Sequence, residues 1–166
     1  MTGETLKVFL IYIRTMIFKT LIALAGTFGL TQLLRKINSF AKTIIVIQLI
    51  AILLTFIPSS PFVLIGWIVF IIAIFLAIIY SFKNDKSGKR LIINLICLPV
   101  FFANLFTLQH WPFASVFSLS CMICLIAFIS KPLTQSKKYK AEIGFLTIIV
   151  IDGLVRFSMA VKGFFE

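Results

Sequence analysis

The sequence predicts an all-α integral membrane protein, a polytopic bundle of five to six transmembrane helices built around two helical hairpins with proline at their turns. Hydrophobic residues make up 61% of the 166 residues, and charged residues make up only 13%. The mean hydropathy is +1.14. The apolar residues form long runs separated by gaps of only about four to ten residues, so no soluble domain fits between them.

Six apolar runs are candidates for helices, at residues 6–34, 43–57, 62–82, 91–108, 113–130 and 141–161. A helix rises about 1.5 Å per residue, so about 20 residues cross a hydrocarbon core of roughly 30 Å. The last four runs are close to this length. The run 43–57 is short, but residues 40–42 can extend it because Lys42 can reach back to the membrane interface.

The first run is longer than one span needs, and it carries Arg14 and Lys19, so only residues 20–34 are free of charge. One arrangement is a single tilted span with its cations near the outer end. Another is an interfacial helix over about residues 6–18 that leads into a shorter crossing. The tilted span is favoured because the basic residues do not lie on one narrow helical face. A secretory signal is a third interpretation, since Ala-Leu-Ala at 23–25 is similar to a cleavage site, but the charges interrupt the apolar region.

Basic loops predict the orientation. Three loops between the runs are strongly basic, at residues 35–42, 83–90 and 131–140. They contain almost all of the net charge of +11, whereas the turns at 58–61 and 109–112 carry none when His110 is neutral. By the positive-inside rule, we expect the basic loops to be cytoplasmic and the two turns to face the opposite side of the membrane. The C-terminus then also lies on that opposite side.

The middle of the chain reads as two related hairpins. Each contains a span, a turn with a Pro-Phe pair and a second span, and the two Pro-Phe pairs are 51 residues apart. Proline enforces these turns because it disfavours helical geometry in the preceding residue and has no amide hydrogen to donate. We therefore divide the chain into a first transmembrane segment, two hairpins, and a basic loop with the last helix, at residues 1–34, 35–82, 83–131 and 132–166.

Residues 104–114, Asn-Leu-Phe-Thr-Leu-Gln-His-Trp-Pro-Phe-Ala, resemble the Leu-Phe-Lys-x-x-His-Trp-Pro-Gly-Ala signature of transmembrane hairpins in bacteria of the Bacteroidota. The best-known carrier is the L-type membrane subunit of the gliding-motility and type 9 secretion motor, and the resemblance covers residues 89–131. Thr107 replaces the signature lysine, and this hairpin lacks the intramembrane acidic residue and the following cytoplasmic region of the motor subunit. The resemblance therefore implies a Bacteroidota lineage and a hairpin suited to helix association, but not a motor stator role. With that lineage, we expect the chain in a bacterial inner membrane, with both turns and the C-terminus on the periplasmic side.

The second turn, Gln109-His110-Trp111-Pro112, holds the only histidine of the chain. A functional interpretation makes His110 a proton relay or a metal ligand, because imidazole changes its charge near neutral pH. The favoured structural interpretation has Trp111 anchored at the headgroup level and Pro112 starting the next helix, with Gln109 and His110 bonding the free backbone groups of the helix ends. No second histidine or nearby carboxylate in the sequence supports a metal, so we expect neither a metal nor a cofactor.

Asp152 and Arg156 are the stronger functional candidates. They lie inside the last apolar run with an i,i+4 spacing that places both side chains on one helical face, and an intramembrane charge is costly enough to need a reason. Three interpretations are open: a self-neutralising pair that fixes the rotation of the helix, an interhelical clamp between Asp152 and Arg14 or Lys19, and a proton or ion path.

The three cysteines allow a redox interpretation. Cys121 and Cys124 form a Cys-x-x-Cys pattern on one helix, and reflection through the turn places Cys97 at a similar depth on the other. A redox pair acting on a quinone needs surroundings that stabilise a thiolate, whereas the sequence neighbours are Ile, Leu and Met. Small buried hydrophobes are therefore the favoured interpretation.

Motifs of soluble enzymes are missing from the sequence, which has no Gly-rich phosphate loop, no His-Glu-x-x-His pattern, and only five acidic residues. We therefore expect no catalytic activity. The positive charge lies in short loops beside spans, so the expected partners are the lipid bilayer and other integral membrane chains, and not nucleic acid.

Three functions remain. The favoured one is a non-catalytic small subunit of an inner-membrane complex that packs against or stabilises larger partners, for example in an envelope secretion, motility or transport assembly. It demands least of a chain with few reactive groups. The second is a small proton- or ion-linked transporter or channel that works through Asp152 and Arg156. The third is a membrane thiol/quinone redox protein.

Overall fold

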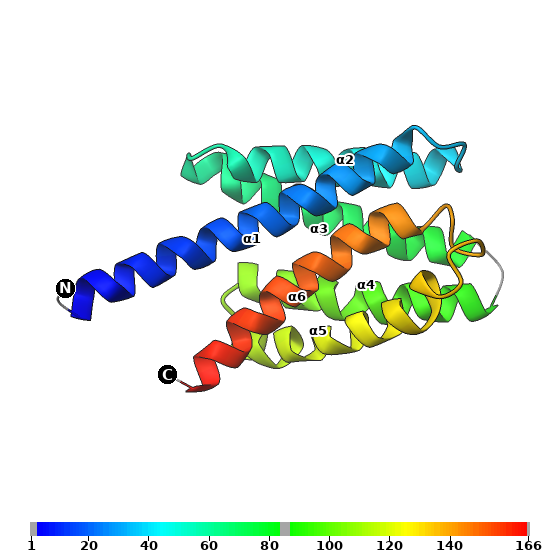
Figure 1. Cartoon of the computed structure of the whole chain (residues 1–166). Helices are drawn as coiled ribbons and strands as arrows, with labels where there is room; N and C mark the ends of the chain where they lie inside the picture. The colour runs from blue at the N-terminus through cyan, green and yellow to red at the C-terminus, as the bar shows by residue number, and fades with distance from the viewer. Residues whose placement is uncertain (1–2, 84–86, 166) are drawn as a thin grey trace.

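A computed structural model describes residues 3–83 and 87–165, and it describes side chains for residues 16–83 and 88–162. Six helices of this part of the chain are long and apolar enough to cross a membrane. They are α1 (Gly3–Leu33), α2 (Ser39–Phe56), α3 (Ser60–Lys83), α4 (Ser87–Leu108), α5 (Ala114–Phe128) and α6 (Ile143–Phe165), and a π-helical turn, η1 (Ile129–Leu133), continues α5 (Figure 1). The predicted all-α polytopic bundle is confirmed, with six candidate spans.

The first helix is continuous. It contains 31 residues, which corresponds to about 46 Å at 1.5 Å per residue, more than a hydrocarbon core of roughly 30 Å requires. Its most apolar part is Met16–Leu33. No break separates an interfacial helix from the crossing, and the first part of α1 extends beyond the rest of the bundle (Figure 1). The side chain of Arg14 lies outside the described residues.

Local sequence signals explain where the hairpin helices begin and end. Asn38 caps α2, because its side-chain oxygen accepts a hydrogen bond from the Phe40 amide at 3.0 Å. The first proline turn then joins α2 to α3, which begins at Ser60, directly before Pro61. Helix α4 continues through Pro99. A proline is tolerated within a membrane helix when packing against neighbouring helices and local adjustments satisfy the freed backbone groups.

The two hairpins, α2 with α3 and α4 with α5, are the most closely packed helix pairs, and α3 lies against α4. Helices α1 and α6 cross the same face of these hairpins (Figure 1). Helix α6 contacts α1, α2, α4 and α5, and half of its span is buried, compared with 22% of the span of α1. Residues on α6 are therefore the ones most constrained by the rest of the fold.

Glycines allow α1 and α6 to approach their neighbours closely. A Cβ atom added at Gly29 would lie 2.8 Å from Ile148 Cδ1, and one added at Gly153 would lie 2.9 Å from Val100 Cγ2. Small residues at helix contacts are typical of membrane proteins, where packing drives association. These two glycines contribute to contacts within this chain, so they are not free to receive a helix of another protein.

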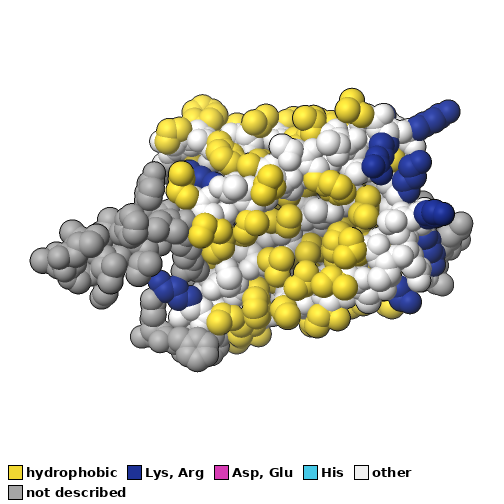
Figure 2. All heavy atoms as spheres, in the orientation of Figure 1, with side chains coloured by type: hydrophobic (Ala, Val, Ile, Leu, Met, Phe, Trp, Pro, Cys, Tyr) yellow, Lys and Arg dark blue, Asp and Glu magenta, His cyan; other side chains and the backbone are white. Residues whose placement is uncertain are grey.

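The surface is divided as a membrane protein requires. Hydrophobic side chains spread over the face of the bundle that Figure 2 shows, and most of the Lys and Arg side chains on this face lie at the end with the three basic loops. Both proline turns, the start of α1 and the end of α6 lie toward the opposite end (Figure 1). The basic loops therefore share one end of the bundle, as the charge pattern predicts.

Candidate functional site: the Asp152 cavity and its charged network

Asp152 and Arg156 meet on α6. Arg156 Nε donates to Asp152 Oδ2 at 3.0 Å, and the side chains retain only 7% and 16% of their exposure, respectively. The i,i+4 spacing produces this contact because residues four apart are neighbours on a helix surface. The pair is self-neutralising, as one of the three sequence interpretations proposes.

Two further side chains connect this pair to other helices. Asn104 on α4 donates from Nδ2 to Asp152 Oδ2 at 2.8 Å and accepts from Arg156 Nη2 through its Oδ1. The Asn104 amide also donates to the Val100 carbonyl of its own helix at 2.9 Å. On the other side, the Arg156 guanidinium lies 5.1 Å from the centre of the Trp67 ring of α3. The charged pair thus joins α6 to α3 and α4.

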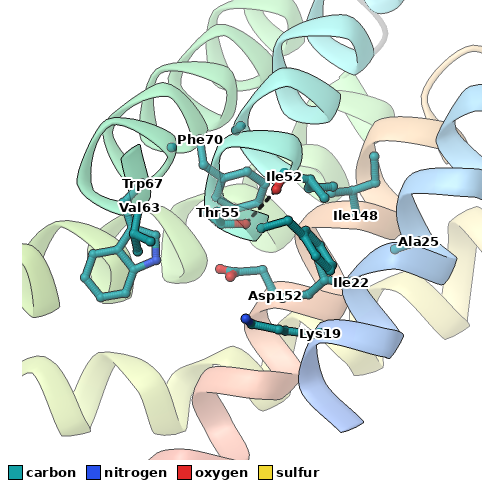
Figure 3. A pocket seen from close by; sticks show the side chains of 13 residues that line it. Lys19, Ile22, Ala25, Ile52, Thr55, Val63, Trp67, Phe70, Ile148 and Asp152 are labelled. Atoms are coloured by element: carbon teal, nitrogen blue, oxygen red, sulfur yellow. Dashed lines mark hydrogen bonds between the residues drawn. The ribbon is translucent and has the colours of Figure 1, made fainter. Parts of the chain in front are cut away.

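A cavity of about 240 Å³ lies beside the network, between α1, α2, α3 and α6. Its wall is mainly apolar, and it includes Trp67, Phe70 and Ile52 (Figure 3). Asp152 and Lys19 point into this cavity from different helices (Figure 3). Asp152 Oδ1 has no hydrogen-bond partner among the described residues, because the bonds from Asn104 and Arg156 both go to Oδ2. One carboxylate oxygen is therefore available to a bound molecule.

Lys19 does not clamp α1 to α6. Its Nζ lies 5.9 Å from the centre of the Phe56 ring, and within the described residues the ion-pair partner of Asp152 is Arg156 rather than Lys19. The Asp152 carboxylate is already compensated by a neighbour on its own helix, which removes the need for a cation from α1. The proposed Lys19 clamp is therefore not formed, and the Arg14 alternative involves a side chain outside the described residues.

A second buried charge lies at the basic end. Glu142, 1% exposed, accepts from Lys89 Nζ at 3.0 Å and from the Tyr80 hydroxyl at 3.3 Å, while its Oε2 has no hydrogen-bond partner. Lys89 also lies 5.4 Å from the centre of the Tyr139 ring. Burial, and secondarily the Glu142 charge, raises the pKa of Tyr139. This cluster was not predicted from the sequence, where the only signal is that Glu142 is one of only five acidic residues.

The histidine turn is a helix cap formed by the backbone. His110 adopts φ 51°, and its amide donates to the Thr107 carbonyl at 3.3 Å, while the Trp111 amide donates to the Phe106 carbonyl at 3.0 Å. These two hydrogen bonds, together with the left-handed conformation of His110, define a Schellman motif. The Trp111 and Phe106 rings, 4.8 Å apart between centroids, supply the apolar contact that accompanies it.

This cap differs from the one expected from the sequence. In the described part of the chain, the side chains of Gln109 and His110 make no hydrogen bond, because the backbone bonds already satisfy the end of α4. Helix α5 begins at Ala114, so Pro112 precedes the helix rather than starting it. Trp111 is 48% exposed, which leaves its ring able to reach the interface.

The cysteines lie in the apolar interior. Cys97, Cys121 and Cys124 are at most 1% exposed, and all three are free thiols. Cys121 Sγ donates to the Phe117 carbonyl at 3.5 Å. Surroundings of this kind disfavour a thiolate, so they do not support thiol chemistry. Among the described residues, no three His, Cys, Asp or Glu side chains gather closely enough to hold a metal ion.

No protein-family model, curated protein or solved structure matches this chain. The resemblance of residues 89–131 to Bacteroidota hairpins stays a prediction.

Proposed function

We propose that the chain is a six-span protein of a bacterial inner membrane that binds a small amphipathic molecule in the Asp152 cavity, in a binding or transport role rather than as an enzyme. The basic loops then face the cytoplasm and the C-terminus faces the periplasm. The observation that carries the proposal is the common cavity into which Asp152 and Lys19 point from two helices (Figure 3).

The cost of the charges supports a functional role for this cavity. A charged side chain within the hydrocarbon region costs about 2.5–3.5 kcal/mol on insertion scales, so such residues commonly mark substrate or ion paths. Asn104 and Arg156 satisfy Oδ2 of Asp152 and leave Oδ1 free. A purely structural pair needs neither the free oxygen nor a second cation directed at the same space.

The two charges define the polar part of the ligand. A lone cation is attracted by Asp152 but repelled by Lys19, and a lone anion meets the opposite problem. A group that donates to Asp152 Oδ1 and accepts from Lys19 Nζ satisfies both residues. The apolar wall and a volume of about 240 Å³ suit a short hydrocarbon chain attached to that group.

Residues around the cavity place it in the half of the bundle remote from the basic loops. On α2 the lining runs to Phe56 and on α3 it starts at Val63, both in the halves of these helices that lead away from the basic end. On α1 it starts at Lys19, in the outer half of the span Met16–Leu33, and Asp152 lies near the middle of α6. In the proposed orientation the ligand therefore enters from the periplasmic half of the bilayer.

A role as a non-catalytic subunit of a larger inner-membrane complex is the second candidate. Helix α1 supports it, because its span is the least buried and carries exposed apolar residues such as Leu24 and Leu30. Gly29 offers no such support, since it packs against α6 of the same chain. Purification from native membranes tests this candidate: a stable partner chain is expected, and an isolated monomer contradicts it.

Tryptophan fluorescence tests ligand binding directly. The chain contains two tryptophans, so Trp111→Phe leaves Trp67, in the cavity wall, as the only reporter. We expect 2-aminooctanoic acid, which joins an ammonium and a carboxylate to a short alkyl chain, to change Trp67 emission in a saturable manner in detergent micelles. The matched control is Trp67→Phe, which reports from Trp111 and should not respond. Equal, non-saturating changes in both variants contradict the proposal.

A further inference from the structure

A second cavity lies at the basic end of the bundle, apart from the Asp152 site. It has a volume of about 330 Å³ and is formed by the last turns of α1, the start of α6 and the loop between η1 and α6. Its polar wall carries three cations, Arg35, Lys137 and Lys140, together with the hydroxyl of Ser136. None of the described residues that line it is acidic, so the lining carries a formal charge of +3.

The loop that supplies two of these cations has a defined conformation. The Gln135 amide donates to the Lys131 carbonyl at 2.8 Å, and the Lys138 amide donates to the Gln135 carbonyl at 2.9 Å. The Tyr139 amide donates to the same Gln135 carbonyl at 3.3 Å. Consecutive turns therefore hold Lys137 and Lys140 at the cavity rather than leaving them on a free strand.

An unsatisfied amide lies in the wall of this cavity. Gln32 is 1% exposed, and its Oε1 has no hydrogen-bond partner. Gly144 leaves room for it, since a Cβ atom at that position would lie 3.0 Å from Gln32 Cβ and Cγ. A buried acceptor without a donor is destabilising, so a ligand hydroxyl that donates to Oε1 stabilises the complex.

The same cavity has an apolar side. Phe28, 37% exposed, and Ile143 line it, and both belong to membrane-spanning helices. The cavity therefore crosses the boundary between the apolar wall of the bundle and its basic end. A free phosphate ion needs cations but no apolar wall, whereas a lipid needs both.

We propose that this cavity binds the headgroup of an anionic glycerophospholipid that carries a free hydroxyl, with the phosphate among Arg35, Lys137 and Lys140 and the hydroxyl donating to Gln32 Oε1. Basic pockets beside membrane helices at the cytoplasmic face are typical sites for such headgroups. The bound lipid connects α1 to the loop before α6 at the end where no hairpin turn joins them.

Competition between two lipids tests the proposal. The purified full chain in detergent is mixed with phosphatidylglycerol and phosphatidylcholine of identical acyl chains, and native mass spectrometry counts the molecules of each that remain bound. We expect one phosphatidylglycerol to be retained in preference. Lys137→Gln with Lys140→Gln should weaken its binding roughly 30-fold, from about 1 kcal/mol for each basic residue near a headgroup. Gln32→Leu should weaken it about fivefold through loss of the acceptor.

A matched control separates the site from general attraction. Lys36→Gln with Lys42→Gln removes two cations from the same end of the bundle, and neither residue lines the cavity. We expect this pair to keep the preference for phosphatidylglycerol. Equal losses in the two double variants overturn the site. Soluble glycerol 1-phosphate that displaces the lipid at a similar concentration overturns the lipid assignment in favour of a free phosphate compound.

Discussion

The ion pair of α6 allows a quantitative test by a double-mutant cycle on Asp152 and Arg156. Both side chains are largely removed from solvent, with 16% and 7% exposure, so the loss of one partner leaves the other charge poorly compensated. Breaking a buried pair typically costs about 3–5 kcal/mol. For Arg156→Met we expect about 3 kcal/mol, at the lower end, because Asn104 still donates to Asp152 Oδ2.

The companion variants complete the cycle. Asp152→Asn should cost about 2 kcal/mol, because Arg156 keeps its contacts with Asn104 and with the Trp67 ring. The double variant removes both charges, and replacement of a buried pair by uncharged groups is often close to neutral, so we expect it within about 1 kcal/mol of the native chain. The two single losses therefore sum to about 5 kcal/mol, and the coupling energy is about 4 kcal/mol.

Reversible unfolding in mixed micelles, followed by circular dichroism, measures these free energies of unfolding. Lys36→Met is a suitable control, because this exposed cation at the basic end should change the free energy by less than about 0.5 kcal/mol. Losses that simply add in the double variant would refute the coupling. Losses below about 0.5 kcal/mol in both single variants would show that the pair does not support the fold.

Substitutions at His110, Gly66 and Tyr139 test particular contacts by thermal unfolding in detergent. His110→Gly should stabilise the chain by up to about 1 kcal/mol, and His110→Val should destabilise it by about 1–2 kcal/mol, because the φ of 51° favours glycine. Equal effects of the two substitutions contradict the backbone cap. Gly66→Ala should cost about 1–3 kcal/mol, since the added Cβ would lie 2.9 Å from the Ala51 carbonyl oxygen. At the control position, Gly88→Ala, the added Cβ meets open space and should cost nothing. Similar losses in the two variants would be inconsistent with the α2–α3 packing. Burial raises the pKa of Tyr139, so in the folded chain its hydroxyl keeps the proton at a pH where the unfolded chain loses it. The contribution of Tyr139 to the free energy of unfolding should therefore be constant below about pH 10 and fall above it. Tyr139→Phe should weaken that fall, and an unchanged pH profile in this variant contradicts the assignment.

The spans and the charged pair could be predicted from the sequence because each depends on local information. Hydrophobic length decides whether a segment crosses a membrane, and α6 begins at Ile143, two residues after the start of the predicted run. The spacing of Asp152 and Arg156 alone decides that they meet on one helix. The three basic loops lie at the same end of the bundle because two membrane-spanning helices separate each loop from the next.

Contacts between helices could not be predicted, since they depend on how each helix is rotated and how deeply it packs. The bond from Asn104 to Asp152 joins positions 48 residues apart, and the direction of Lys19 into the cavity depends on the approach of α1 to α6. The Glu142 cluster joins the loop before α6 to α3 and α4 in the same way. At His110 a backbone motif replaces the expected side-chain cap. The sequence could not predict this motif, because a single sequence does not show the φ angle of a residue.

Ligand selectivity tests the central claim, that Asp152 and Lys19 together hold the polar group of a bound molecule. Trp67 emission measures the affinities of 2-aminooctanoic acid, octylamine and octanoic acid for the native cavity, for Lys19→Gln and for Asp152→Asn, all in the Trp111→Phe background. We expect the native cavity to prefer the amino acid, Lys19→Gln to prefer octylamine, and Asp152→Asn to prefer octanoic acid. The same order of affinities in all three proteins contradicts the claim.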